Sequence, residues 1–252
     1  AEEHLPANTN QAVGIVRIDR TKALPRFVYY FFRQPDTFKA IQSLGGGQAA
    51  QPNLNLANLK QIKLRLPSIG TQQSIVNVLS TYNDLIENNR RRMSLLEASA
   101  RLLYREWFVR PRFPGCEHTS ITDGVPAGWV LKSLGDLCRE IRESVSPDKL
   151  EPDTPYIGLE HMPRRSISLG DWGTVEQVSS SKHRFLAGEI LFGKIRPYFH
   201  KVGVAFVDGV ASSDAIVIRP AHESLHGFVL MTVSSDEFVA VTSQAMKEGS
   251  KM

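Results

Sequence analysis

The chain has few of the residues that cross-link secreted proteins or bind structural metals. Its 252 residues include only two cysteines, Cys116 and Cys138, and neither lies in a CxxC pair or beside ligand-spaced histidines. This spacing argues against a disulfide framework and structural zinc, and we expect a reducing, cytoplasmic setting. No apolar run approaches the roughly 18 residues that a membrane span needs. The first eleven residues carry two acids and no apolar centre, so they do not read as a secretion signal.

Motifs that would identify an enzyme are also missing. The sequence contains no GxxxxGK[ST] phosphate loop, no Asn-Pro-Pro-aromatic methyltransferase motif, and no HExxH or other metal-ligand spacing. Three histidines, His161, His183 and His200, lie near acids along the chain, and a hydrolase built on them is one hypothesis. Histidines that only form hydrogen bonds are far more common, so we expect a protein that binds and does not catalyse.

The net charge of +4 fits nucleic-acid binding without requiring it. Two basic runs, 182–184 and 194–201, are the strongest candidates, and the second interleaves cations with aromatic rings, as expected of a segment that meets phosphates and base edges. Solvated strand edges would look similar. The pair Arg164-Arg165 is a weaker cluster, and Arg17, Arg20, Lys22 and Arg26 form another. The predicted DNA contacts are Lys182, Arg184, Lys194, Arg196, Tyr198, His200 and Lys201.

The longest regular pattern runs from about Thr71 to Phe108. The stretch contains no proline or glycine, and its apolar residues alternate in steps of four and three. This heptad seam predicts a helix of roughly 57 Å that packs along another helix. Thr71 is the expected N-cap, and Arg90-Arg91-Arg92 is read as a charged flank of the seam. The predicted helix-pairing residues are Ile75, Leu79, Tyr82, Ile86, Asn89, Met93, Leu96, Ala100, Leu103 and Trp107.

Shorter α/β patterns flank this helix on both sides. Before it we expect a buried strand at 12–18, a helix near 38–44 that ends at Gly45-Gly46-Gly47, and a strand at 62–66. After it, residues 111–128 read as a connector. The second region predicts a helix at 133–141, strands at 156–159, 201–206 and 215–219, a turn and strand within 188–196, and a closing helix at 228–246.

The closing region repeats the opening one. Gly227-Phe228-Val229 through Ser243 matches Arg26-Phe27-Val28 through Ser43 at an offset of about 200 residues, and Ile216–Arg219 lies over Gly14–Arg17. Chance similarity of two strand–helix units is the alternative. On the repeat interpretation the chain holds roughly one and a quarter units, beginning inside one copy of a globular domain and ending inside the next.

Three motifs, in this order and spacing, resemble the DNA-specificity subunits of Type I restriction–modification systems. Residues 66–76, LPSIGTQQSIV, are similar to the family's "LPPLxxQxxIV" helix start. Residues 125–130, VPAGWV, followed by LGDL at 134–137, resemble its "LPxGW…LGD" opening of a recognition domain. Residues 188–198, GEILFGKIRPY, are similar to its "GDIL…R…P" strand.

The resemblance implies an α+β fold with mixed α/β target-recognition domains joined by a long coiled-coil helix. The implied domains are the C-terminal part of a first recognition domain (1–66), the spacer helix (67–110), the connector (111–128), and a second recognition domain without its following helix (129–252). It implies a non-catalytic subunit that recognises a bipartite double-stranded DNA target. Methyltransferase subunits and motor-nuclease subunits are the implied partners, and S-adenosylmethionine, magnesium and ATP are expected only on them.

Two further expectations concern partners. Because the helix that should follow the second domain is missing, we predict that two chains pair through the seam, in antiparallel orientation. The main alternative function is a coiled-coil scaffold whose globular ends bind protein instead of DNA.

Overall fold

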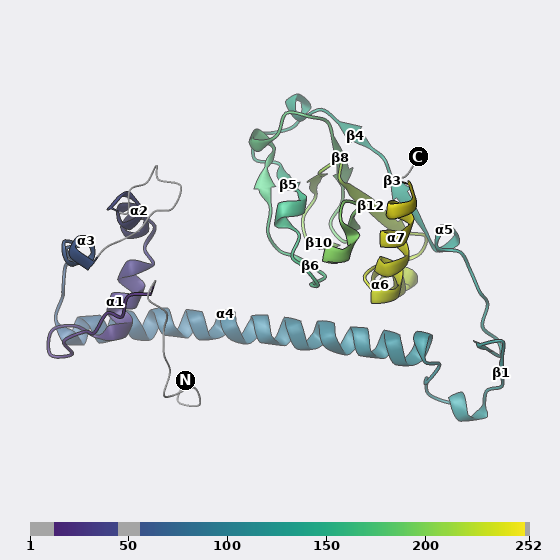
Figure 1. Cartoon of the computed structure of the whole chain (residues 1–252), viewed down its shortest axis with the longest axis horizontal. Helices are drawn as coiled ribbons and strands as arrows, with labels where there is room; N and C mark the ends of the chain where they lie inside the picture. The colour runs from purple at the N-terminus through teal and green to yellow at the C-terminus, as the bar shows by residue number, and fades with distance from the viewer. Residues whose placement is uncertain (1–12, 45–55, 250–252) are drawn as a thin grey trace. The chain divides into compact units, whose positions relative to one another are not determined.

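The computed structural model describes residues 13–44 and 56–249. The chain divides into two compact units, Ala1–Arg90 and Arg91–Met252. Each unit is described by itself. The boundary falls within one helix, α4 (Ile69–Tyr104) (Figure 1).

Helix α4 is the long helix that the heptad seam predicts. It has 36 residues, which correspond to about 54 Å, and one π-helical turn, Arg105–Val109, extends it. The helix starts two residues earlier than expected, so Thr71 is not its N-cap. The Ser68 hydroxyl instead accepts a hydrogen bond from the Thr71 amide at 3.2 Å. Neither α4 nor any other described helix is long and apolar enough to cross a membrane.

The first unit has three short helices before α4, which are α1 (Pro25–Phe32), α2 (Pro35–Leu44) and α3 (Leu56–Lys60). Helix α1 contacts the start of α4, where the Tyr30 hydroxyl accepts from the Asn83 side chain at 2.9 Å. Val28 of α1 and Val76 of α4 are both buried. Gln72 is fully buried, and its side-chain oxygen accepts from the Leu24 amide at 2.9 Å. Its side-chain nitrogen donates to the carbonyls of Lys22 and Pro67 at 3.2 and 2.9 Å, so this one side chain ties the helix start to the turn before α1.

Two strands expected in the first unit do not form. Residues 13–18 are non-helical and carry no strand, and Val13, Ile15 and Val16 are exposed instead of buried. Residues 62–68 are likewise irregular. A strand needs a hydrogen-bonded neighbour, and no described residue of this unit supplies one. The β-branched run at 12–18 and the alternating apolar residues at 62–66 therefore gave the wrong prediction. The predicted Gly45–Gly47 helix end and residue 12 lie outside the described residues.

The second unit contains two five-stranded sheets and a small hairpin, β1 (Ile121–Thr122) with β2 (Val125–Pro126). The first sheet has the order β3-β12-β9-β10-β6 and the second β4-β8-β11-β5-β7. Only β10 with β6 and β11 with β5 are parallel pairs. The strands are β3 (Cys138–Ile141), β4 (Ser144–Val145), β5 (Pro155–Ile157), β6 (Ser168–Leu169), β7 (Gly173–Thr174), β8 (Lys182–Phe185), β9 (Ile190–Gly193), β10 (Val202–Ala205), β11 (Gly209–Ala211) and β12 (Ala215–Pro220).

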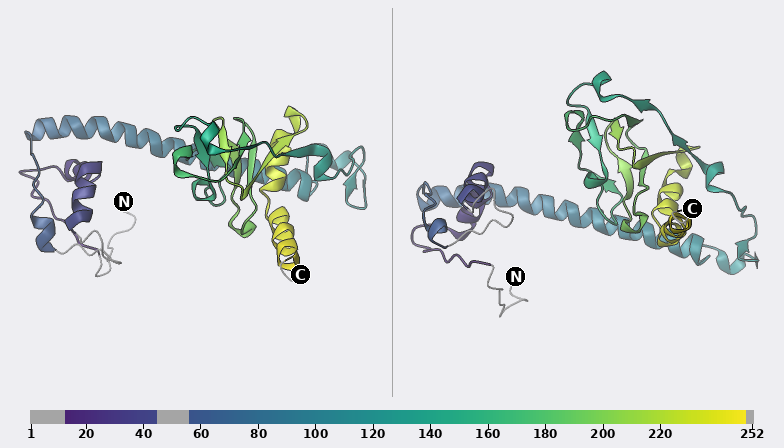
Figure 2. Two further views of the ribbon diagram at one scale, coloured as in Figure 1. Left: turned by 90° about the horizontal axis from the view of Figure 1, so that it is seen from above. Right: turned by 45° about the horizontal axis from the view of Figure 1, so that its top comes forward.

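The core of this unit is layered. One apolar cluster lies between the sheets and joins Ile157 and Phe185 of the second sheet to Leu191 and Val217 of the first. The other face of the first sheet packs on α6 (His226–Val233). The other face of the second sheet is covered by residues of the intervening loops, including Val175. Figure 2 shows α6 and the following α7 (Asp236–Gly249) together on one flank of the strands.

Helices α6 and α7 are the structural counterpart of α1 and α2. Helices α1 and α6 begin 201 residues apart, at positions 25 and 226. Helices α2 and α7 are separated by the same distance, at positions 35 and 236. The single closing helix that we expected is in fact two helices that break at Ser234-Ser235. The repeat therefore extends to the helix pair, whereas Ile216–Arg219 form the middle of β12 and their counterparts at 14–17 carry no strand.

The predicted α+β class is confirmed by the long helix and the two mixed sheets. Two further predictions, both in the second unit, were wrong. The stretch 133–141 is helical only over α5 (Leu134–Leu137), because Cys138–Ile141 pair with β12. The strand that we expected at 194–196, after a turn, lies earlier, at Ile190–Gly193, and residues 194–196 lead into a 3₁₀ turn at Pro197–Phe199.

Candidate nucleic-acid interface

The strand registers bring three loops of the second unit to one end of its sheets. Gly193 lies opposite Ala215 across β9 and β12, Phe192 opposite Val202, and Ala211 beside Ile157. The connections that follow these positions are residues 158–167, 194–201 and 212–214, which we call the loop end. Backbone hydrogen bonds join them, including Lys194 N–H to the Asp214 carbonyl at 2.9 Å.

Charge is segregated between the two ends of the sheets. The loop end carries five cations, Arg164, Arg165, Lys194, Arg196 and Lys201, against two acids, Glu160 and Asp214. The segment 146–154 leaves β4 beside Lys182 and crosses from the loop end to the start of β5. The connections that lie at the opposite end, 186–189 and 206–208, carry no cation and two acids, Glu189 and Asp208. The excess of cations therefore attracts a polyanion to the loop end.

A three-residue clamp fixes the two longest loops to each other and to α7. The Arg165 amide donates to the His200 carbonyl at 3.1 Å. The Arg165 guanidinium lies 3.1 Å from His200 Nε2 and 3.0 Å from an Asp236 carboxylate oxygen at the start of α7. His200 Nε2 is also 3.4 Å from that oxygen. Because a guanidinium only donates, His200 Nε2 accepts and its ring is neutral.

The surroundings of His200 lower the pKa of its imidazole below the ordinary value of 6.5. Burial is the largest cause, and the positive charge of Arg165 is the next. The Asp236 carboxylate and a backbone hydrogen bond to Ser234 oppose this shift, whereas Arg101 adds to it. Protonating His200 would place a cation against Arg165 in a nearly buried site.

Three residues of these loops adopt backbone conformations that ordinary side chains avoid. Arg165, Arg196 and His200 have φ angles of 58°, 52° and 52°, in the left-handed region. Such residues each cost of order 1–3 kcal/mol and persist only where their surroundings impose them. Two of the three, Arg165 and His200, belong to the clamp.

The predicted DNA contacts have different surroundings. Lys182 is buried, and its ammonium group donates to the carbonyl and the hydroxyl of Ser180 at 2.7 Å each. His200 is buried in the clamp, and the ammonium group of Lys201 donates to the Leu159 carbonyl. Lys194, Arg196 and Tyr198 are exposed, with Tyr198 58% accessible. These three are the predicted contacts whose side chains face solvent at the loop end.

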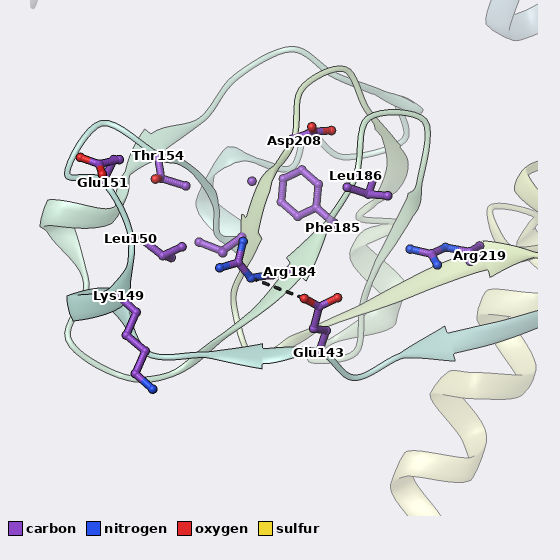
Figure 3. Close-up of a pocket in the computed structure, with 12 residues that line it drawn as sticks. Glu143, Lys149, Leu150, Glu151, Thr154, Arg184, Phe185, Leu186, Asp208 and Arg219 are labelled. Atoms are coloured by element: carbon purple, nitrogen blue, oxygen red, sulfur yellow. Dashed lines mark ion pairs between the residues drawn. The ribbon is translucent and has the colours of Figure 1, made fainter.

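Arg184 lines a pocket of about 440 Å³, together with Leu186 and Asp208 from the end of the sheets opposite the loop end (Figure 3). Its guanidinium points at Glu143, 3.6 Å away. Asp208, on the same pocket wall, accepts from the Ala187 amide at 2.7 Å. Because acidic and basic side chains both line this pocket, it is not suited to binding a phosphate backbone. Among the described residues, no group of three His, Cys, Asp or Glu side chains is placed to hold a metal ion.

The last turns of α4 are attached to the same loops. Glu97 accepts from the Ser166 hydroxyl at 2.8 Å, and the Arg101 guanidinium donates to the Ser234 carbonyl at 3.2 Å. Beyond them, Phe108 contacts the rings of Tyr104, Trp129 and Phe228 at centroid distances of 5.7, 5.4 and 4.7 Å. Neither the clamp nor this attachment could be predicted from the sequence. Arg165, His200 and Asp236 are separated by about 35 residues from one to the next and form no motif.

The predicted pairing residues of α4 are mostly exposed. Tyr82 and Leu96 are 64% and 70% accessible, and Ile86, Met93 and Leu103 are near one half. Ile75 and Leu79 line a shallow groove with Tyr30 and Phe31 of α1, whereas Ala100 packs against the α6 cluster.

The second unit thus presents a basic loop end on two sheets, attached to the last turns of a long helix with exposed apolar side chains. Comparison with known proteins shows what the chain is similar to. Residues 4–98 match the model of the Type I restriction modification DNA specificity domain. The resemblance to specificity subunits of Type I restriction enzymes is confirmed.

Similar proteins include two curated specificity subunits. The Type I restriction enzyme MjaIX specificity subunit of Methanocaldococcus jannaschii is 28% identical over 62% of this chain and 38% of its own length. The EcoDI specificity subunit of Escherichia coli is 25% identical over 77% of this chain and 48% of its own length. The matches thus span less than half of these relatives. The solved S subunit from M. genitalium has a TM-score of 0.41 at 15% identity, over 92% of this chain and 58% of that chain.

Proposed function

We propose that this chain is a DNA-specificity subunit of a Type I restriction–modification system, in the cytoplasm. It reads one part of a bipartite double-stranded target with the loop end of its second unit. The observation that carries the proposal is the segregation of charge, with five cations against two acids at the loop end and two acids without a cation in the connections 186–189 and 206–208 at the other. The family match of residues 4–98 supports the same function.

The chemistry of such a system would lie on other subunits. We propose that the chain itself is not a catalyst, and that it docks methyltransferase subunits and, through them, motor-nuclease subunits. S-adenosylmethionine, magnesium and ATP would be bound by those partners. The relatives MjaIX and EcoDI are named as specificity subunits of Type I restriction enzymes, which supports this division of labour.

We further propose that two copies of the chain pair through α4, in antiparallel orientation. The support is the row of exposed apolar side chains, among them Tyr82, Ile86, Met93 and Leu96. Burying such a row removes apolar surface from water, at about 25 cal/mol per Å². Asn89 within the seam would fix the register of the pair.

Selection from a random-sequence duplex pool tests the DNA-reading proposal. The purified chain, alone and with its methyltransferase subunits, is expected to enrich a defined motif at physiological salt. Equal retention of all duplexes would contradict it. The exposed seam also suits a scaffold that binds proteins. Co-purification of methyltransferase subunits without any enriched motif would favour that second function.

A further inference from the structure

Arg164 is an exposed arginine of the loop end whose side chain contacts an aromatic ring. It is not one of the predicted DNA contacts. The guanidinium carbon of Arg164 lies 3.9 Å from the centroid of the Phe199 ring. Phe199 belongs to the 3₁₀ turn Pro197–Phe199, in the neighbouring loop. The contact is a cation–π stack between two loops that are 35 residues apart in sequence.

The stacking changes what the arginine can do. A free arginine side chain loses about 2 kcal/mol of rotamer entropy when a ligand immobilises it. Arg164 is exposed, and the ring contact already restrains its planar head. The ring contact is made at the central carbon of the guanidinium, and no hydrogen bond among the described residues uses its N–H groups, which form the fork that binds phosphate oxygens or guanine O6 and N7.

The neighbourhood of Arg164 completes a reading surface. Tyr198 is next to Phe199, with ring centroids 4.7 Å apart, and is 58% exposed. Arg196 is exposed at the start of the same turn. The clamp of Arg165, His200 and Asp236 directly behind Arg164 fixes the relative position of the two loops. Left-handed backbone at Arg165, Arg196 and His200 concentrates strain in this one place, as functional sites often do.

We propose that Arg164, stacked on Phe199, is a DNA-contacting residue whose planar fork binds the duplex beside Arg196 and Tyr198. Arg165, His200 and Asp236 are positioning residues for it. The proposal rests on the DNA-reading function proposed above and names a residue that this function uses. In this proposal the Phe199 ring supports the Arg164 guanidinium and does not itself contact the DNA.

The test measures affinity for the duplex that the unaltered chain enriches from the random pool. Arg164→Ala is expected to weaken binding roughly 5- to 150-fold, the range for losing one good bidentate contact. Arg164→Lys should recover only part of the loss, because lysine keeps the charge without the fork. Phe199→Leu should weaken binding less than Arg164→Ala, since the guanidinium remains but is no longer restrained.

Arg139→Ala is the matched control. Arg139 is an exposed arginine of the same unit, on β3 and opposite Arg219, and its replacement should change affinity by no more than about twofold. Circular dichroism of each variant checks the fold. The assignment is overturned if Arg164→Ala binds as the unaltered chain does, if Arg164→Lys binds equally well, or if Arg139→Ala loses as much. If the unaltered chain enriches no duplex, the proposed function fails and this inference falls with it.

Discussion

Gln72 is the polar centre of the first unit, and replacing it with methionine is a sharp test of how the helix start is held. The side chain is fully buried and makes three hydrogen bonds, to the backbones of Leu24, Lys22 and Pro67. Methionine has a similar volume and a similar helix propensity, so the change removes hydrogen bonds without creating a large cavity.

The expected loss can be worked out from these bonds. Each contributes about 0.5–1.5 kcal/mol net, so the three together contribute about 1.5–4.5 kcal/mol. That is a substantial part of the 5–15 kcal/mol that typically stabilises a domain. Urea unfolding should report the lower free energy of unfolding, and amide hydrogen exchange should locate it at residues 22–24 and 69–76.

Gln73→Met is the matched control. Gln73 is the next residue of the same helix, is exposed, and bonds only Asn77, one turn on, at 2.7 Å. Its replacement should cost no more than about 0.5 kcal/mol, as is usual for surface substitutions. The reasoning is refuted if the two variants lose equal stability, or if exchange at residues 69–76 is unchanged in Gln72→Met.

Three further predictions follow from the second unit and the helix. Because the folded-state pKa of His200 is lowered, the unfolded chain binds more protons near pH 6, and stability should fall as pH drops below 6.5; the loss should be smaller in His200→Gln, as followed by thermal unfolding. Trp129→Ala should cost about 2 kcal/mol, because the Phe108 and Phe113 rings lose their contacts at 5.4 and 4.9 Å, and an unchanged free energy of unfolding would contradict this role. If two chains pair through α4, light scattering at micromolar concentration should give a dimer mass, and Leu96→Asp, at a 70% exposed seam position, should give a monomer without loss of helix content. A monomer for the unaltered chain would refute the pairing.

The sequence predicted the elements that depend on local pattern. A heptad repeat without proline or glycine is sufficient for α4, and the similarity of residues 26–43 to 227–243 correctly indicated that the two segments share a structure, although a helix pair was not predicted for either. The strands at 12–18 and 62–66 failed for the opposite reason. A strand is defined by its neighbours, so Ile216–Arg219 pair between β3 and β9 whereas the similar residues 14–17 find no described partner.

The candidate site could be predicted in region but not in detail. Interleaved cations and aromatic rings at 194–201 pointed to the segment that lies at the loop end. Nothing in the pattern distinguished exposed Arg196 from buried His200, because burial of His200 depends on Arg165 and Asp236, which are distant in sequence. The sequence likewise did not indicate that Lys182 is buried. Its ammonium group donates to the Ser180 carbonyl.

The salt dependence of DNA binding by the unaltered chain and by Lys194→Ala/Arg196→Ala tests the central claim most directly. Both cations are exposed at the loop end, and each phosphate contact contributes about −0.9 to the slope of log affinity against log salt. The unaltered chain should therefore bind its selected duplex with a steep negative slope, and the double variant should bind more weakly with a slope shallower by up to about two. Equal affinity and equal slope for the two proteins would contradict the assignment of the loop end as the DNA interface.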